Sequence, residues 1–323
     1  MTARKKVILD VDTGVDDALA IMLAVASGEL DILGITTVNG NVSLNQATLN
    51  TCKILELLGV SGQIPVFRGA DAPLLRKPVF EHRVHGADGI GGALRDHAVT
   101  KRAEAEAAED FIIRQLSAQR GEVTLIMTAP LTNLARALHK CPELTQYAAE
   151  VIVMGGVVQG FGNVTPTAEY NMYVDPEAAK LVLAAGFPKL TLVGLDVTRR
   201  ALLGADDIQK LQNPVIREYV EQSTADYRTR YFERNGVQAC ALHDPLAVGV
   251  ALNRSFVTVQ NYYVDVETRS DLCDGQTVCD FQNRLGKPAN TGVCLEVDAP
   301  AFLECFITSL NRLNQEPKKD GSH

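Results

Sequence analysis

Short apolar runs alternate with stretches of helical periodicity along the first two thirds of the chain. The runs predict buried strands at residues 6–9, 31–38, 64–67, 123–127, 150–154 and 189–195, and the periodic stretches predict helices at residues 18–26, 44–58, 103–120 and 134–139. Strands that alternate with helices predict an α/β fold with an open, mostly parallel, Rossmann-like sheet flanked by helices. Ligands of such sheets bind outside the carboxyl ends of the strands, so we expect the active site there.

The last third of the chain predicts helices first and strands later. We expect a helical region at residues 205–235, a helix that opens at residues 242–246, strands at residues 257–266, 277–281 and 293–297, and a final helix at residues 300–313. The sequence contains no internal repeat and no linker-like segment. We therefore predict a single domain over residues 1–316, followed by a polar tail, residues 317–323, that we expect to be disordered.

Polar residues stand where several predicted strands end. Asp10 and Asp12 follow the first strand, Asn41 follows the second, and Thr128 and Asp196 follow later strands. Because the carboxyl ends of parallel strands lie at one edge of a sheet, we expect these residues to share one rim.

Four carboxylates crowd the turn after the first strand: Asp10, Asp12, Asp16 and Asp17. Ionised carboxylates this close repel one another, and a hard divalent cation with oxygen ligands would neutralise them. Helix capping is the simpler alternative, because Thr13 and Asp16 have capping-box spacing and acids favour the first turn of a helix. Capping leaves Asp10 and Asp12 unexplained, so a metal site is the favoured interpretation.

Two named motifs compete for the same turn. An EF-hand loop that begins at Asp10 needs glycine and glutamate where the chain has Val15 and Ile21, so this motif is excluded. The string at residues 10–13 also resembles the nucleophile motif of haloacid-dehalogenase-type phosphatases, in which Asp10 would attack phosphorus and Asp12 would act as the acid. This phosphatase interpretation stays open as the alternative.

Two long loops carry further candidate residues. The irregular stretch 68–100 is a candidate lid that holds His85 among glycines, but no Gly-Lys-Ser/Thr follows, so its resemblance to a phosphate loop is weak. The loop at residues 157–174 contains Asn163, Glu169 and Asn171, whose amide and carboxylate groups suit the hydroxyls of a sugar.

Two candidate pairs lie on predicted helices. Tyr227 and Tyr231 are four residues apart on one helical face, which is typical of a core stripe. His243 and Asp244 open a helix, where Asp244 could be a simple cap. A histidine beside a carboxylate, however, has the pKa range of a general acid near neutral pH.

Composition and charge limit the class of partner. A chain of 323 residues that is 46% hydrophobic can bury a large core, and its net charge of −8 argues against nucleic acid as a partner and favours a small molecule. No apolar run reaches about 18 residues and the amino terminus lacks a signal-type core, so we expect a cytoplasmic protein without a membrane partner. The seven cysteines are scattered and form no C-x-x-C pair, which predicts neither disulfides nor a zinc site.

An ordered set of short motifs is similar to that of the inosine-uridine-preferring nucleoside hydrolase family. The motifs occupy residues 10–18, 38–41, 85–86, 128–133, 154–156, 168–171, 175–178 and 243–245. The resemblance covers practically the whole chain, from the first strand to the last helix. It implies the nucleoside hydrolase fold, a homodimer or homotetramer, and hydrolysis of the N-glycosidic bond of ribonucleosides to free base and ribose in nucleoside salvage.

The resemblance implies a calcium ion as cofactor. Its ligands would be the carboxylates of Asp12, Asp17 and Asp244 and the backbone carbonyl of Thr128, completed by a water and by the 2′- and 3′-hydroxyls of ribose. By the same resemblance Asp12 would take a proton from the water that attacks C1′, and His243 would protonate the leaving base.

The remaining candidates are implied to surround the substrate. The resemblance assigns ribose and nearby substrate contacts to Asp16, Asn41, Met154, Asn163, Glu169 and Asn171. His85 would lie over the base, and Tyr227 and Tyr231 are candidates for contact with it.

Three departures from the family pattern are small. Thr13 stands where many members have proline, Ala129 where glycine is usual, and Tyr170 where phenylalanine is common. The absence of tryptophan favours the inosine- and uridine-cleaving group over the purine-restricted one, and the preferred base stays open. A calcium-dependent nucleoside-binding protein without catalysis is a third class, but the presence of both Asp12 and His243 favours an enzyme.

Overall fold

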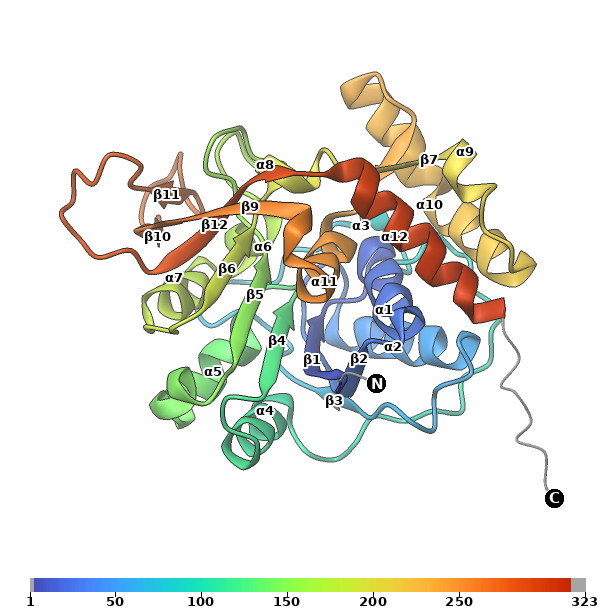
Figure 1. Cartoon of the computed structure of the whole chain (residues 1–323), viewed down its shortest axis with the longest axis horizontal. Helices are drawn as coiled ribbons and strands as arrows, with labels where there is room; N and C mark the ends of the chain where they lie inside the picture. Colours follow the sequence, from blue (N-terminus) through green and yellow to red (C-terminus); the bar gives the residue numbers. More distant parts are fainter. Residues whose placement is uncertain (1–2, 315–323) are drawn as a thin grey trace.

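The chain is built around an eight-stranded sheet, which Figure 1 shows in a computed structural model that describes residues 3–314. In spatial order the strands are β3 (Val66–Arg68), β2 (Leu30–Thr37), β1 (Lys5–Val11), β4 (Val123–Met127), β5 (Glu150–Met154), β6 (Leu190–Val193), β12 (Thr291–Val297) and β9 (Val257–Tyr262). All neighbours are parallel except the antiparallel pair β12 and β9. This topology confirms the predicted Rossmann-like sheet, while the polar tail at residues 317–323 lies outside the described residues.

Helices and two small sheets complete the fold. The helices are α1 (Val15–Ser27), α2 (Leu44–Leu57), α3 (His82–His85), α4 (Ala108–Ala118), α5 (Thr132–Lys140), α6 (Tyr170–Val174), α7 (Pro176–Ala184), α8 (Leu195–Thr198), α9 (Ala205–Ile208), α10 (Pro214–Asn235), α11 (His243–Leu252) and α12 (Ala299–Asn311), with short 3-10 turns η1 (Pro142–Gln146), η2 (Arg254–Phe256) and η3 (Arg312–Asn314). The small antiparallel sheets pair β7 (Leu202–Gly204) with β8 (Ala239–Ala241), and β10 (Val264–Val266) with β11 (Thr277–Cys279). No helix among residues 3–314 has both the length and the apolar character needed to cross a membrane.

Helices cover both faces of the sheet. Successive side chains of a strand point to opposite faces, and in β1 Val7 and Leu9 join a core cluster with α1, α11 and α12, whereas Ile8 joins one with α4, α5 and α7 (Figure 1). Burial on both sides explains why the strands are continuous apolar runs rather than alternating ones.

Two of the predicted helical regions differ from the structure. The helix predicted at residues 103–120 is shorter, because α4 covers only Ala108–Ala118, and the region 205–235 contains two helices rather than one. The break precedes Pro214, which occupies the first position of α10, while the Asn213 side chain accepts hydrogen bonds from the backbone N–H groups of Val215 and Ile216. A proline fits the first turn of a helix but not its interior, so a new helix begins there.

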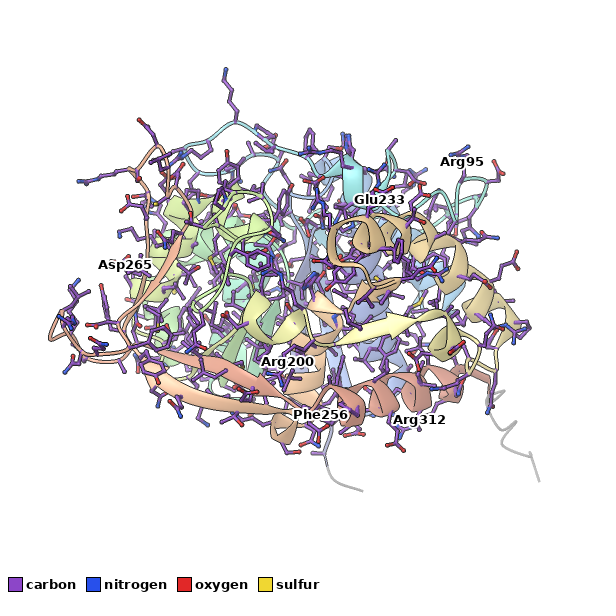
Figure 2. All side chains as sticks on the ribbon, turned by 90° about the horizontal axis from the view of Figure 1, so that it is seen from above. Arg95, Arg200, Glu233, Phe256, Asp265 and Arg312 are labelled. Carbon is purple, nitrogen blue, oxygen red and sulfur yellow. The ribbon has the colours of Figure 1, made fainter. Side chains whose placement is uncertain are left out.

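The strand predicted at residues 257–266 is also divided. The Asn290 side chain accepts a hydrogen bond from the Val264 N–H, at 2.8 Å, and donates one to the Val264 carbonyl, at 2.9 Å. These bonds occupy the backbone of Val264, so the chain leaves the large sheet after β9 and pairs as β10 with β11. The small sheet carries Asp265 at one end of the molecule, far from Arg95 (Figure 2). The strand predicted at residues 277–281 is likewise shortened to β11.

The sheet contains a point where the strand order reverses. The chain passes from β1 to β2 and β3 on one side, and then returns to place β4 on the other side of β1. Such a reversal opens a crevice at the carboxyl edge. The turn after β1 and the residues after β4 meet there, since the Thr128 N–H donates to the Asp10 carbonyl at 2.9 Å.

Candidate active site

Asp10 takes no part in the crevice. Its side chain is fully buried and accepts hydrogen bonds from the Thr36 hydroxyl and, at 2.7 Å, from the Asn133 amide. A phosphatase of the haloacid-dehalogenase type would need Asp10 as an accessible nucleophile. The phosphatase interpretation is therefore wrong, and Asp10 serves to join β1 with its neighbours.

Asp17, not Asp16, caps helix α1. The Asp17 carboxylate accepts a hydrogen bond from the Gly14 N–H at 2.9 Å and another from the Thr128 hydroxyl at 2.9 Å. The expected capping box between Thr13 and Asp16 does not form. Asp16 instead lies almost fully buried, and its Oδ1 atom has no hydrogen-bond partner among the described residues.

Asp12 is held from one side by Asn41. The Asn41 N–H donates to Asp12 Oδ2 at 2.6 Å, and the Asn41 amide donates to Oδ1 at 3.2 Å. The backbone of Gly40 passes so close that a β-carbon there would lie 1.9 Å from Asp12 Oδ2. Asp12 is fully buried behind Asn41 and does not line the cavity described below.

Three carboxylates form a candidate metal centre. Asp16, Asp17 and Asp244, which lies in the first turn of α11, each offer an oxygen within 4.8 Å of the others. Burial raises the pKa of all three carboxyl groups, that of Asp16 to about 8, and the charges of neighbouring acids add to the rise for Asp16 and Asp244. Bringing a cation here would offset both effects, because it favours the ionised form of each acid. Of the predicted ligands, Asp17 and Asp244 belong to this cluster, Asp16 joins them, and Asp12 does not.

The Thr128 carbonyl lies at the end of β4 and accepts a hydrogen bond from the Asn171 amide at 2.9 Å. Ala129, which replaces the usual glycine, is fully buried and packs with Val38 and Ala70. Its methyl group therefore belongs to a small apolar cluster and is absent from the cavity lining. The replacement leaves Thr128 at the cavity.

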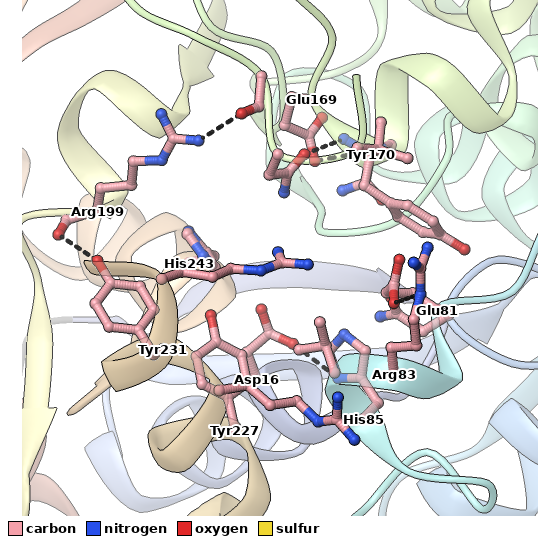
Figure 3. Close-up of a pocket in the computed structure, with 18 of the residues that line it drawn as sticks. Asp16, Glu81, Arg83, His85, Glu169, Tyr170, Arg199, Tyr227, Tyr231 and His243 are labelled. Carbon is pink, nitrogen blue, oxygen red and sulfur yellow. Dashed lines mark hydrogen bonds and ion pairs between the residues drawn. The ribbon is translucent and has the colours of Figure 1, made fainter. Parts of the chain in front are cut away.

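A cavity of about 480 Å³ opens above these acids (Figure 3). The predicted residues that line it are Asp16, Asn41, His85, Thr128, Met154, Asn163, Glu169, Asn171, Tyr227, Tyr231, His243 and Asp244. The volume suits one small-molecule ligand. The structure thus brings together all predicted site residues except Asp12 and Asp17, which lie directly behind the lining.

One wall of the cavity comes from the loop before α6. The end of this loop is helical, contrary to prediction, and Glu169 caps α6 by accepting hydrogen bonds from the N–H groups of Asn171, at 3.0 Å, and Met172, at 3.3 Å. Its carboxylate also accepts one from the Gly156 N–H, at 2.9 Å. Asn163 Oδ1 accepts from the Tyr170 N–H at 2.9 Å. Burial raises the pKa of Glu169 to about 7. These bonds fix the side chains of Glu169 and Asn163 in place before a ligand arrives.

The opposite wall carries two histidines. His85 Nδ1 accepts a hydrogen bond from the Val15 N–H at 3.0 Å, so its proton is on Nε2, and His243 Nδ1 lies 2.7 Å from the Thr198 hydroxyl. Burial lowers the pKa of His85 to about 4 and, together with the charge of Arg199, that of His243 to about 3. Both rings are thus neutral near pH 7, whereas the sequence had suggested a pKa near neutrality for His243.

Tyr227 and Tyr231 extend this wall. Their rings stack with centroids 6.2 Å apart, and the Tyr227 ring lies edge-on to His85 at 6.4 Å. Tyr227 is buried, as a core stripe would be, yet both rings also face the cavity. The two interpretations of this pair are therefore compatible.

Several lining residues escaped the sequence analysis, among them Glu81, Arg83, Phe161, Arg199 and Arg230. The Arg199 guanidinium donates to the carbonyls of Phe161, at 2.7 Å, and Gly162, at 2.9 Å, and lies 4.3 Å from the centre of the Phe161 ring (Figure 3). The position of Arg199 after a strand end was the only available signal.

Asp196, which was expected at the same rim, does not line the cavity. Its carboxylate accepts hydrogen bonds from the N–H groups of Val158, at 3.0 Å, and Gln159, at 2.7 Å. It therefore supports the start of the loop that forms the sugar-facing wall.

Fold and cavity together define an α/β protein that binds a small molecule at the carboxyl edge of its sheet. Residues 7–304 match the family model described as inosine-uridine preferring nucleoside hydrolase. An uncharacterized protein of Schizosaccharomyces pombe is 38% identical over 315 residues, which cover 95% of this chain and 99% of the relative. The pyrimidine-specific ribonucleoside hydrolase RihB of Escherichia coli (strain SE11) is 35% identical over 302 residues, 93% of this chain and 95% of the relative. The solved structure of a purine-preferring ribonucleoside hydrolase from Gardnerella vaginalis has a TM-score of 0.88 at 33% identity and covers 96% of this chain and 99% of that one.

The chain belongs to the inosine-uridine-preferring nucleoside hydrolase family. It is an N-ribosyl hydrolase, an enzyme that cleaves the N-glycosidic bond of ribonucleosides. The family and the fold expected from the sequence are both confirmed.

Proposed function

We propose that this hydrolysis depends on calcium and that the acidic cluster holds the ion. The supporting observation is the group of Asp16, Asp17 and Asp244, whose buried carboxylates converge beside a cavity of nucleoside size. Among residues 3–314 their only ion-pair contact is His85 Nδ1, 3.8 Å from Asp16 Oδ1, and that ring is neutral near pH 7. Buried acids without a cationic partner are costly, and a site made only of oxygens suits a hard divalent ion.

The ligands would be Asp17, Asp244 and the Thr128 carbonyl, with Asp12 as the family resemblance implies. Asp16 Oδ1 is buried without a hydrogen-bond partner, the state expected of an oxygen that awaits a ligand, and it would face the ion or the ribose. When bound, calcium would acidify and position a water and hold the vicinal hydroxyls of ribose.

We propose that Asp12 accepts a proton from the water that attacks C1′. The two hydrogen bonds from Asn41 fix the orientation of its carboxylate. Cleavage of a glycosidic bond passes through an oxocarbenium-like state. Asp16 and Glu169, both buried at the cavity, would stabilise the positive charge that develops on the sugar. Asn41, Asn163 and Asn171 would bind its hydroxyls.

The base would lie between the histidines and the tyrosine pair. We propose that the Thr198 hydroxyl donates to Nδ1, which would leave a proton on His243 Nε2 for the leaving base. His85 would present its own Nε2–H group from the same wall, and Tyr227 and Tyr231 would contact the base. The relatives named above include one pyrimidine-specific and one purine-preferring enzyme at similar identity, so the preferred base requires direct measurement.

The deciding experiment measures release of base and ribose from inosine, uridine, cytidine, adenosine and guanosine, with a calcium chelator and after calcium is restored. We expect chelation to abolish release and calcium to restore it. Asp244→Asn should lower activity by more than the roughly 100-fold that loss of an outer contact costs a metal site. Asp31→Asn, at an exposed position of β2, is the matched control and should leave activity unchanged.

The outcomes separate the parts of the proposal. Ribose release that survives complete removal of divalent ions would refute the calcium requirement. If neither base nor ribose is released from any of the five nucleosides, the assignment of these substrates is refuted. A clear ranking among them would establish the preferred base.

We also propose that the enzyme serves nucleoside salvage in the cytoplasm as a homodimer or homotetramer. All seven cysteines are free, as in a reducing compartment. Sedimentation velocity measures the assembly directly, and a monomer at micromolar concentration would contradict the oligomer.

A further inference from the structure

The chain after His85 runs as a strap, residues 86–101, along one side of α2. Three side chains of α2 hold it at successive positions: the Asn50 amide donates to the Asp88 carbonyl at 2.8 Å, the Lys53 ammonium donates to the Leu94 carbonyl at 2.6 Å, and Glu56 Oε1 accepts from the N–H groups of Thr100 and Lys101 at 2.8 and 2.7 Å. Positions three residues apart are neighbours on a helix surface. The strap is therefore fixed to α2 along its whole length.

The strap also packs against α10 on its other side. A β-carbon on Gly91 would lie 2.6 Å from the Ser223 carbonyl of α10. Figure 2 shows Arg95 of the strap and Glu233 of α10 on the same side of the molecule. The strap thus fills the space between α2 and the helix that carries Tyr227 and Tyr231.

Asn50 differs from the other two anchors because it also binds a segment outside the strap. Its amide also donates to the carbonyl of Thr13 at 3.0 Å, and its Oδ1 accepts from the Gln46 amide at 2.8 Å. Asn50 is fully buried. Its two amide hydrogens therefore bridge a carbonyl of the strap and a carbonyl of the turn that contains Asp12, Asp16 and Asp17.

His85 lies at the junction of these two segments. It immediately precedes the strap and accepts the hydrogen bond of the Val15 N–H, which belongs to the acidic turn. The contact is close, since a β-carbon on Gly14 would lie 2.7 Å from His85 Nδ1. Asn50 binds both segments, through the Thr13 carbonyl of the acidic turn and the Asp88 carbonyl of the strap. The base-facing histidine and the acidic turn thus share one support.

We propose that Asn50 is a positioning residue that couples the acidic cluster to His85. Through its two donated hydrogen bonds it sets the distance between the part of the site that holds ion and ribose and the part that faces the base. The kinetic part of this inference rests on the proposed function, whereas the structural part does not. An aspartate at this position would have the same size but would place an acceptor against two carbonyls, so both bonds would be lost.

Hydrogen exchange tests the bridge without reference to activity. In Asn50→Asp we expect amide exchange to accelerate at least about tenfold, the effect of losing local protection, in peptides covering both residues 13–18 and residues 85–92, with β9 unchanged. Gln46→Ala is the matched control, because it removes the bond that Asn50 accepts and keeps both that it donates. Gln46→Ala should leave the amide exchange rates of both peptides as in the wild type. Asn50→Ala, which deletes the donors without adding charge, replaces Asn50→Asp if the latter does not fold.

Acceleration in only one of the two peptides, or a uniform increase across the protein, would overturn the bridge. The first result would mean that Asn50 supports a single segment. The second would mean that it contributes only to general stability.

A double-mutant cycle with His85→Ala tests the coupling. In the wild-type background Asn50→Asp should lower kcat/KM by about 10- to 100-fold, the usual effect of losing a contact behind a site. In the His85→Ala background the same substitution should cost at least about five times less, because residues that act through one another are not additive. Equal costs in both backgrounds would overturn the coupling. If the wild type releases no base from any nucleoside, the proposed function fails while the exchange experiment still decides the bridge.

Discussion

Gly40 is the position at which we expect the addition of a single methyl group to disturb the acidic turn most. A β-carbon built on Gly40 would lie 1.9 Å from Asp12 Oδ2 and 2.7 Å from its carboxyl carbon. The Asp12 carboxylate would have to move by about 1.5 Å to reach an ordinary contact distance. Its 2.6 Å hydrogen bond from the Asn41 N–H would be lost in the process.

Gly40→Ala should therefore act on catalysis through Asp12. A misplacement of about 1 Å at a reacting group can lower the rate about 100-fold, so we expect kcat/KM to fall by at least that factor. The backbone of Gly40 is not left-handed, and the effect is purely steric. Steady-state hydrolysis of the best nucleoside, at saturating calcium, measures it.

Gly62→Ala is the matched control. Gly62 has no atom within 4 Å of its missing β-carbon and no left-handed backbone, so alanine should be neutral or stabilise the fold by about 0.4–1 kcal/mol. Circular dichroism should show that both variants are folded. If Gly40→Ala retains kcat/KM within about threefold of the wild type, then either the Asp12 carboxylate does not lie where the structure places it or Asp12 has no part in the reaction.

Three further substitutions test separate roles. Asp12→Asn keeps the size of the side chain and removes its charge, so turnover should be abolished; a near-normal kcat would contradict both roles given to Asp12. His243→Ala should slow hydrolysis of inosine far more than that of a riboside with an activated phenolate leaving group, and equal losses would exclude a role on the leaving base. Asn133→Ala removes one of the two hydrogen bonds to the buried carboxylate of Asp10 and leaves the buried Ala70 N–H without a partner, so the free energy of unfolding should fall by about 2 kcal/mol. Urea denaturation measures this fall, and a loss below about 1 kcal/mol would contradict the importance given to those bonds.

The sheet and its rim could be predicted because burial on both faces leaves a strong pattern. Strands such as β4 and β5 are short, mostly apolar runs with a single polar residue each, and each ends at a polar or glycine turn. Parallel strands bring such turns to one edge whatever their separation in sequence, which is why Thr128 and the acids after β1 could be placed together. The divided strand after residue 257 could not be predicted, because the residue that divides it, Asn290, is distant in sequence.

The separate roles of the four acids of the first turn could not be predicted from the sequence either. Spacing alone indicates that Asp10, Asp12, Asp16 and Asp17 are close, but not which carboxylate the neighbouring strands and loops will bind. Asp10 is bound by Asn133 and Asp17 by Thr128, both of which lie after β4, whereas Asp12 is bound by Asn41, which lies after β2. Arg199 was missed for a similar reason, since the loop carbonyls that it binds are more than thirty residues away.

The acidic cluster is supported almost entirely from behind. Backbone N–H groups and side-chain donors from several segments bind Asp12 and Asp17, whereas the cavity side offers Asp16 and Asp244 no lysine or arginine partner among residues 3–314. The fold thus holds these carboxylates in place against their mutual repulsion and leaves their charge uncompensated toward the cavity. An ion bound there would stabilise the folded protein by the same interaction that makes it catalytic, because anything that binds only the native state adds its binding free energy to stability.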